Sequence, residues 1–90
     1  MEFEWDPDKS EINLSKHDVS FPEASTVFGD PLSLTNYDPD HSDDEDRYIT
    51  IGESSNGQLL IVSHTDRDDQ IRIMSARRAT RRERKASENG

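Results

Sequence analysis

The residues whose type and spacing most suggest chemistry are the arginines near the end of the chain. Seven of the eleven Lys and Arg residues lie in residues 70–85, QIRIMSARRATRRERK, although the net charge of the chain is −9. Guanidinium groups bind phosphate oxygens in pairs and can stabilise the charge that develops during phosphoryl transfer without a metal. This stretch therefore predicts a surface for an anionic partner.

The charge is divided unevenly along the chain. Residues 1–70 contain four cations and eighteen acids, a net charge of −14, whereas residues 71–90 contain seven cations and two acids, a net charge of +5. Such a division indicates a cationic patch, with the acidic remainder limiting nonspecific adhesion. The alternative is that carboxylates within the fold neutralise these arginines.

His64 is the histidine closest to this cluster in the sequence. It lies with Arg67, Arg72 and Arg77 on or between the last two predicted strands, where a histidine can transfer a proton. The default interpretation of His64 is a surface or capping histidine, and that of Arg72 is exposure to solvent. Arg77 and Arg78 are adjacent, so they face opposite ways on a strand.

Several other kinds of site are excluded by the sequence. The chain has no cysteine, no Gly-rich phosphate loop and no G-x-S-x-G motif, and its three histidines lack zinc-type spacing. The acidic stretch 37–46 does not match an EF-hand loop, which needs Gly and Glu where Asp43 and Ile49 stand. We expect no metal and no cofactor. No signal peptide or membrane span is recognisable, so a cytoplasmic location is expected.

In the first half of the chain, helix-capping residues are the main evidence for secondary structure. An alternating strand is predicted for residues 1–5, and Asp6 and Pro7 then begin a helix that runs to about His17. Its apolar face is thin, mainly Ile12 and Leu14. A capping box at residues 20–23 begins a second helix, which residues 29–31 end. Residues 32–34 are expected to be a short extended segment.

The second half of the chain predicts a meander of three strands. Residues 47–54 and 58–65 are joined by Asn56-Gly57, a strong hairpin signal, and residues 71–77 follow a second turn. Residues 59–62 are apolar on both faces, which predicts a central strand. A capping box from Thr80 to Glu83 begins a short C-terminal helix.

Together these elements predict an α+β fold in the order β-α-α-β-β-β-α. Two N-terminal helices would pack on one face of a mainly antiparallel four-stranded sheet. Residues 1–86 would form a single domain, and residues 87–90 a frayed polar tail.

Four groups of residues resemble the BrnT family, the toxins of BrnT/BrnA type II toxin–antitoxin modules. They are Phe3-x-Trp5-Asp6 with Lys9 and Asn13; Lys16-His17 followed by Val19-Ser20-Phe21-x-Glu23-Ala24 and Val27-Phe28-x-Asp30-Pro31; Glu45-x-Arg47; and Ile71-Arg72-Ile73-x-Ser75-Ala76-Arg77 with Ala79 and Glu83. The sequence departs from the family in Asp18, where Gly is usual, in Met74, which replaces a common Ile, and in a C-terminus without the usual aromatic residue. Asp tolerates the positive φ that such a turn needs.

The resemblance implies a RelE-like fold and a metal-independent endoribonuclease that uses the substrate 2′-hydroxyl and inhibits translation. It also implies a BrnA-like antitoxin with a ribbon-helix-helix region, in a 2:2 heterotetramer that represses its own operon. Operator DNA would then be bound only through the antitoxin. The alternative is a non-catalytic domain, either a co-regulator or a module whose basic edge docks a protein partner.

The resemblance also assigns roles to individual residues. The expected catalytic residues are His64, Arg67, Arg72 and Arg77, and the expected RNA-binding residues are Lys16, Arg78, Arg81 and Arg82. Lys16 and Glu53 are secondary candidates for proton transfer.

Overall fold

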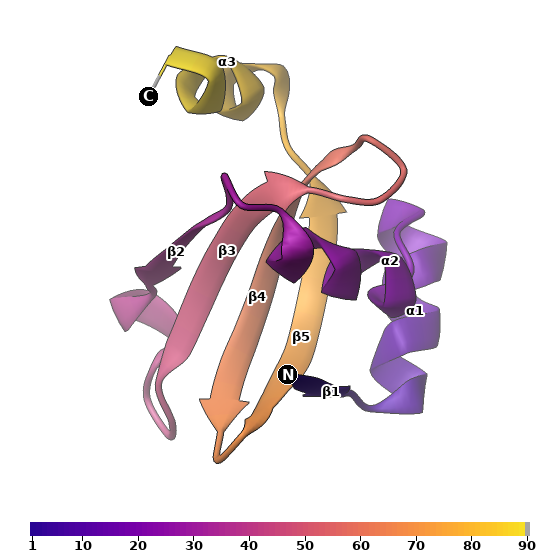
Figure 1. Cartoon of the computed structure of the whole chain (residues 1–90). Helices are drawn as coiled ribbons and strands as arrows, with labels where there is room; N and C mark the ends of the chain where they lie inside the picture. The colour runs from indigo at the N-terminus through magenta and orange to yellow at the C-terminus, as the bar shows by residue number, and fades with distance from the viewer. Residues whose placement is uncertain (90) are drawn as a thin grey trace.

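The computed structural model describes residues 1–89, which form one mixed sheet with three α-helices and two short 3₁₀ helices (Figure 1). The elements are β1 (Glu2–Glu4), α1 (Pro7–His17), α2 (Phe21–Thr26), η1 (Val27–Gly29), β2 (Leu34–Tyr37), η2 (Pro39–His41), β3 (Arg47–Glu53), β4 (Leu59–Arg67), β5 (Gln70–Arg78) and α3 (Arg81–Asn89). None of the helices within the described residues is long and apolar enough to cross a membrane.

The sheet has five strands in the order β1-β5-β4-β3-β2, so β4 is central, as its apolar run predicted. β1 pairs with β5 in parallel, and the other pairs are antiparallel. The prediction of four strands was wrong, because residues 34–37 form a fifth strand beside β3. All four residues of β2 are exposed, so no alternation of apolar and polar residues marks it as a strand.

The core lies between α2 with η1 and one face of the sheet. Its buried members are Val19, Phe21, Ala24, Val27, Leu60, Val62, Ile73 and Ala76, with Phe3, Trp5 and Phe28 packed against them. Aromatic pairs extend the core toward the N-terminus: the ring centroids of Trp5 and Phe21 are 6.0 Å apart, and those of Phe3 and Phe28 are 5.3 Å apart.

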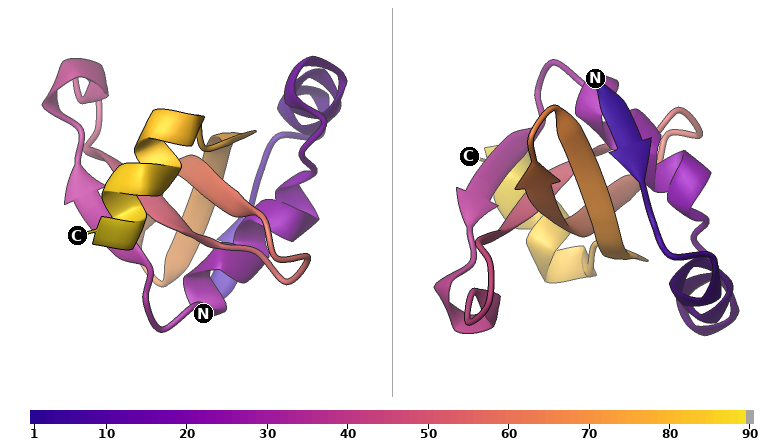
Figure 2. Two further views of the ribbon diagram at one scale, coloured as in Figure 1. Left: turned by 90° about the horizontal axis from the view of Figure 1, so that it is seen from above. Right: turned by 90° about the horizontal axis from the view of Figure 1, so that it is seen from below.

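Helix α1 does not share that face with α2, contrary to our prediction. It lies along the edge of β5 and projects from the other side of the sheet, as the view from above shows (Figure 2). Asn13 fixes it there: its amide donates to Ala76 O at 2.9 Å and accepts from Ala76 N at 3.1 Å. Ile12 and Leu14, the expected apolar face, are exposed. A helix with so few apolar residues is held by the bonds of a buried amide instead.

The predicted caps and turns are confirmed. Asp6 and Ser20 accept hydrogen bonds from Asp8 N and Glu23 N, and Thr80 and Glu83 form a reciprocal capping box. Asp18 has φ 57° at the end of α1, the left-handed conformation predicted where Asp replaces Gly. Gly57 has φ 79° in the β3–β4 hairpin.

Helix α3 continues to Asn89, so residues 87–89 are helical where we predicted the frayed tail to begin. Gly90 lies outside the described residues. The domain limit at residue 86 remains a prediction.

Candidate functional site

The face of the sheet opposite α2, which we call the open face, has walls on two sides. In the view from above, α1 and η2 project from this side at the two edges of the sheet, and α2 lies on the other side (Figure 2). The surface of the sheet between these walls is the floor of the open face, and the strand register shows which residues lie side by side on it. Arg47, Thr65 and Arg72 lie in one row, Ile49, Ser63 and Ser75 in the next, and Ile51, Ile61 and Arg77 in the third.

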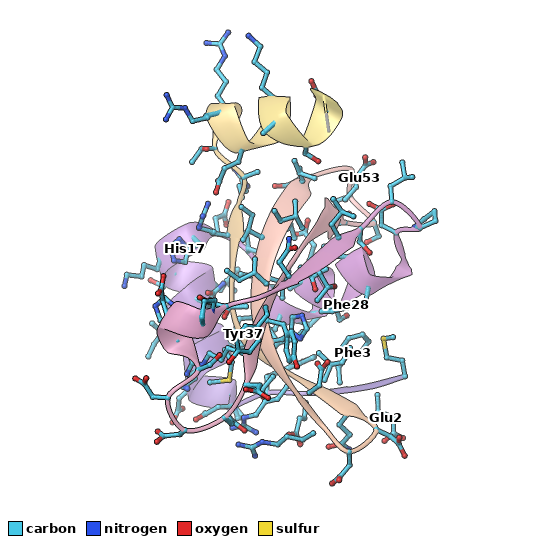
Figure 3. All side chains as sticks on the ribbon, turned by 90° about the vertical axis from the view of Figure 1, so that its left-hand side faces the viewer. Glu2, Phe3, His17, Phe28, Tyr37 and Glu53 are labelled. Atoms are coloured by element: carbon cyan, nitrogen blue, oxygen red, sulfur yellow. The ribbon has the colours of Figure 1, made fainter. Side chains whose placement is uncertain are left out.

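A groove of about 240 Å³ lies on this floor between the two walls, and we call it the RNA groove for the role proposed below. Ser63 and Ser75 form part of its base, where their small side chains leave room above the sheet, and Ala76, whose side chain is buried in the core, also borders it. Arg47 and Arg77 also line it, and each wall contributes a histidine: His17 from the end of α1 and His41 from η2. Figure 3 shows His17 on its helix. Two cations and two imidazoles thus converge on one surface.

His41 is held in a defined orientation. Its Nδ1 donates to Asp38 Oδ2 at 2.8 Å, and the Asp38 side chain is largely buried. A neutral imidazole that donates from Nδ1 presents an unprotonated Nε2, the atom that can accept a proton from a substrate. His41 therefore has the geometry of a general base.

Arg77 is the one predicted catalytic residue that lines the RNA groove. Its two terminal nitrogens bind Glu83 of α3 at 2.8 and 3.0 Å. This pairing raises the pKa of Arg77 and lowers the pKa of Glu83 to about 2. A guanidinium has five N–H donors, so Arg77 keeps donors for a phosphate while α3 holds it in position.

Arg67 and Arg72 lie toward the other end of the open face. Arg67 forms a bidentate pair with Glu45, both bonds 2.9 Å long, which lowers the pKa of Glu45. Arg72 lies 3.5 Å from Glu4. Arg72 and Arg77 are five positions apart along β5, roughly 16 Å at about 3.3 Å per residue. The three arginines therefore do not converge on one phosphate.

His64 lies outside the RNA groove. It is 2 % exposed, on the side of the sheet covered by α2 and η1, with its ring 4.9 Å from that of Phe28. Nδ1 donates to Asp66 at 3.0 Å, so Nε2 accepts from the Thr50 hydroxyl at 2.7 Å. Burial lowers the pKa of His64. This environment is that of a hydrogen-bonded core histidine, so the default interpretation of a surface or capping histidine was wrong.

The remaining predicted site residues are scattered over the surface. Arg78 faces away from Arg77, as predicted, and lies 3.3 Å from Asp18. Lys16, Arg81 and Arg82 are exposed on α1 and α3. Glu53 is exposed at the end of β3, beneath α3 in Figure 3. The structure gathers none of these residues at the RNA groove.

His17, His41 and Arg47 are the groove residues that sequence reasoning did not select. Arg47 was quoted only as part of a family match, and the two histidines only as poor zinc ligands. Residue type alone could have pointed to the histidines as proton-transfer groups. His17 and His41 line the same groove because α1 and η2 project from the same side of the sheet, which the sequence does not specify. Within residues 1–89, no group of three or more His, Asp or Glu residues is arranged to hold a metal ion.

Comparison with known proteins gives a family match and a structural match. Residues 5–83 match the family described as "Ribonuclease toxin, BrnT, of type II toxin-antitoxin system". The fold is similar to the crystal structure of the Brucella abortus ribonuclease toxin, BrnT, with a TM-score of 0.66 and 21 % sequence identity. That match covers 90 % of this chain and 99 % of the other. No curated protein sequence matches significantly.

Proposed function

The chain belongs to the BrnT family of ribonuclease toxins of type II toxin–antitoxin systems, and from this premise we propose that its RNA groove is an endoribonuclease site. The observation that carries the proposal is the convergence of His17, His41, Arg47 and Arg77 on the open face. These are the groups that cleavage of an RNA phosphodiester needs: two for proton transfer and two for the charge on phosphorus.

The proposed reaction uses the substrate's own 2′-hydroxyl. His41 removes the 2′-hydroxyl proton at Nε2, and O2′ attacks the adjacent phosphorus. The P–O5′ bond breaks as His17, in its protonated form, gives a proton to O5′. The products are a 2′,3′-cyclic phosphate and a 5′-hydroxyl. Arg77 and Arg47 stabilise the charge on the phosphoryl oxygens during the transfer.

The arginines outside the groove have a supporting role in this proposal. Arg67 and Arg72 lie on the same face, where they can contact neighbouring phosphates of a bound strand. Each already has a carboxylate partner, so phosphate must compete with Glu45 or Glu4. Such competition makes RNA binding weak and sensitive to salt.

The wider biology follows from the family. We propose that RNA cleavage inhibits translation and that a BrnA-like ribbon-helix-helix antitoxin neutralises this chain in a 2:2 heterotetramer. The complex, rather than the toxin alone, would bind operator DNA and repress the operon.

The test is cleavage of a 5′-labelled RNA by the purified chain in EDTA, with analysis of the product ends. We expect 2′,3′-cyclic phosphate ends and a bell-shaped pH profile. His17→Asn and His41→Asn should each lower kcat by roughly 10²-fold or more. Lys9→Ala, an exposed change elsewhere on α1, is the control. Wild-type cleavage rates in a folded His17→Asn/His41→Asn double variant would rule out this groove as the catalytic site.

One observation favours the non-catalytic alternative, a partner-binding or co-regulator domain. Arg67, Arg72, Arg77 and Arg78 all have carboxylate partners within the chain, so they can serve the fold alone. The same assay decides between the two. If the folded chain cleaves no RNA and does not arrest growth on expression, whereas partner binding persists, the alternative holds.

A further inference from the structure

A β-bulge in strand β5 decides which of its residues reach the RNA groove. The register with β4 shifts at this point, which leaves Met74 as an extra residue without a partner. Ile73 and Ala76 are both buried in the core although they are three positions apart, an arrangement that regular alternation would not allow. The bulge therefore turns Ser75 and Arg77 toward the open face. Bulges commonly re-aim side chains in this way beside active sites.

The residue that the bulge places opposite Ser75 is Ser63, and both line the RNA groove. Ser63 is half-buried and Ser75 is exposed. Facing hydroxyls on adjacent strands commonly bond each other, but within residues 1–89 these two bond neither each other nor any other group. Four other serine hydroxyls are bonded within the fold, those of Ser20, Ser25, Ser42 and Ser54. Two hydroxyls on the groove floor are therefore free to donate to a ligand.

Ser63 lies midway between the two arginines of the RNA groove. Arg47 is on β3, Arg77 is on β5 two rows away, and Ser63 is on β4 in the row between them. With strands about 4.8 Å apart and about 3.3 Å per residue, its Cα is roughly 8 Å from the Cα of each arginine. A phosphate held by both guanidinium groups therefore lies above Ser63, with Ser75 beside it.

We propose that the hydroxyls of Ser63 and Ser75 donate hydrogen bonds to a nonbridging oxygen of the scissile phosphate, so that the centre of the floor is a phosphate subsite. This proposal rests on the proposed function and adds two substrate-contacting residues to it. A phosphoryl oxygen accepts hydrogen bonds, and a hydroxyl can rotate its proton toward it. Donors fixed where negative charge develops stabilise the transition state more than the bound substrate.

The floor of the groove suits a phosphate better than a base. Proteins that hold unpaired bases stack them on aromatic rings or guanidinium planes. Among the described residues, no Phe, Tyr or Trp lines the RNA groove, and its two imidazoles stand on the walls. The Arg77 guanidinium is held by Glu83. Neutral donors between two cations complete the hydrogen bonds of an anionic group instead.

The test uses RNA in which sulfur replaces one nonbridging oxygen at the mapped cleavage site, as separate Rp and Sp forms. Sulfur accepts hydrogen bonds weakly, so the wild type should cleave one form more slowly than the other. Ser63→Ala should lower kcat on unmodified RNA by roughly 10²-fold. It should also reduce the rate ratio of the two forms by roughly threefold or more, because the bond that sulfur weakens is already absent.

Two further variants frame that result. Ser75→Ala should change kcat and the Rp/Sp ratio in the same direction but by less, because Ser75 is the more exposed of the pair. Ser15→Ala is the matched control, since Ser15 is an exposed serine on α1, and it should leave both values within about 2-fold of the wild type.

Three results would overturn the proposal. One is a wild-type kcat in a folded Ser63→Ala variant. Another is a lower kcat with an unchanged ratio between the Rp and Sp forms, which would give Ser63 a structural role alone. The third is a change in the bases that flank the cleavage sites with no change in that ratio, which would assign the serines to base recognition.

A binding measurement separates failure of this proposal from failure of the catalytic one. A short labelled oligodeoxynucleotide has phosphates but no 2′-hydroxyl, so the proposed reaction cannot cleave it. The double variant Ser63→Ala/Ser75→Ala should raise its Kd roughly threefold or more. If the wild type cleaves no RNA, this Kd decides: a rise leaves the phosphate subsite standing without the catalytic proposal, and an unchanged Kd refutes both.

Discussion

At the scale of single residues, His64 shows how environment decides the role of a histidine. Its ring links three strands, because Thr50 of β3 donates to it at 2.7 Å and also lies 2.7 Å from the Thr35 hydroxyl of β2. The sequence places His64 near Arg67 and Arg72, and the family resemblance made it an expected catalytic residue. The pleat turns its side chain to the opposite face of the sheet, where it is buried.

The first prediction concerns His64 and pH. Burial lowers the pKa of His64 in the folded state below its unfolded value of 6.5. The unfolded chain therefore binds a proton more readily, so the stability from the neutral ring is complete above pH 6.5 and declines as pH falls. We expect the free energy of unfolding, measured by urea denaturation, to decrease from pH 7 to pH 5. The decrease should be smaller in His64→Gln, because glutamine does not titrate between pH 5 and pH 7. An equal decrease in both proteins would show that protonation of His64 does not cause it.

At the scale of elements, α1 has an unusual attachment. Asn13 bonds the backbone of Ala76 on β5 in both directions and also donates to Val19 O at 3.0 Å. One amide therefore fixes the helix to the strand edge and to the turn that follows the helix. This attachment positions His17 at the wall of the RNA groove.

The second prediction tests that attachment. Asn13→Ala leaves the Ala76 amide and carbonyl without their partners, so it should lower the free energy of unfolding by about 2–3 kcal/mol. Ser15→Ala, at an exposed position on the same helix, should change it by less than about 0.5 kcal/mol. Urea denaturation measures both. Similar small losses in the two variants would show that α1 is held by other contacts.

Helix α3 depends on a different interaction. It has no buried side chain among residues 81–88, and Glu83 binds both the Arg77 guanidinium and Thr80 N. The capping box could be predicted from the sequence because it is local. The ion pair with Arg77 could not, because it requires the chain to turn back after β5.

The third prediction concerns Glu83. Its pKa is lowered to about 2, mainly by Arg77, so the pair contributes stability above pH 4.5 that is lost as pH falls toward 2. Glu83→Gln keeps a capping side chain but removes the charge. Amide hydrogen exchange in residues 82–89 should accelerate in this variant at pH 7, whereas exchange in β4 should not change. Unchanged exchange in α3 would mean that the pair does not anchor the helix.

At the scale of the whole molecule, the distribution of charge separates two surfaces. Acidic residues pair with the arginines of β4 and β5, whereas Arg47 of β3 and the cations of α3 form no ion pair with another described residue. The expected alternative, carboxylates within the fold pairing with arginines, therefore describes β4 and β5. A cationic patch for an anionic partner stays a prediction, and α3 is where the structure leaves cations available for it.

The sequence by itself determined the features that depend on neighbouring residues. Caps at Asp6, Ser20 and Thr80, the Asn56-Gly57 turn and the central position of β4 all follow from local backbone preference and apolar pattern, whereas the left-handed Asp18 was predicted from the family resemblance. The family resemblance followed from residues in the right order along almost the whole chain.

Only the tertiary structure decided which side chains meet. Strand β2 forms because β3 offers it an edge, and its own residues stay exposed. His17 and His41 are far apart in the sequence and come to the same groove because α1 and η2 project from the same side of the sheet. Arg77 joins them, whereas Arg67 and Arg72 lie farther down the open face, since strand geometry fixes their spacing. Convergence of this kind is set by packing between distant elements, which no local pattern specifies.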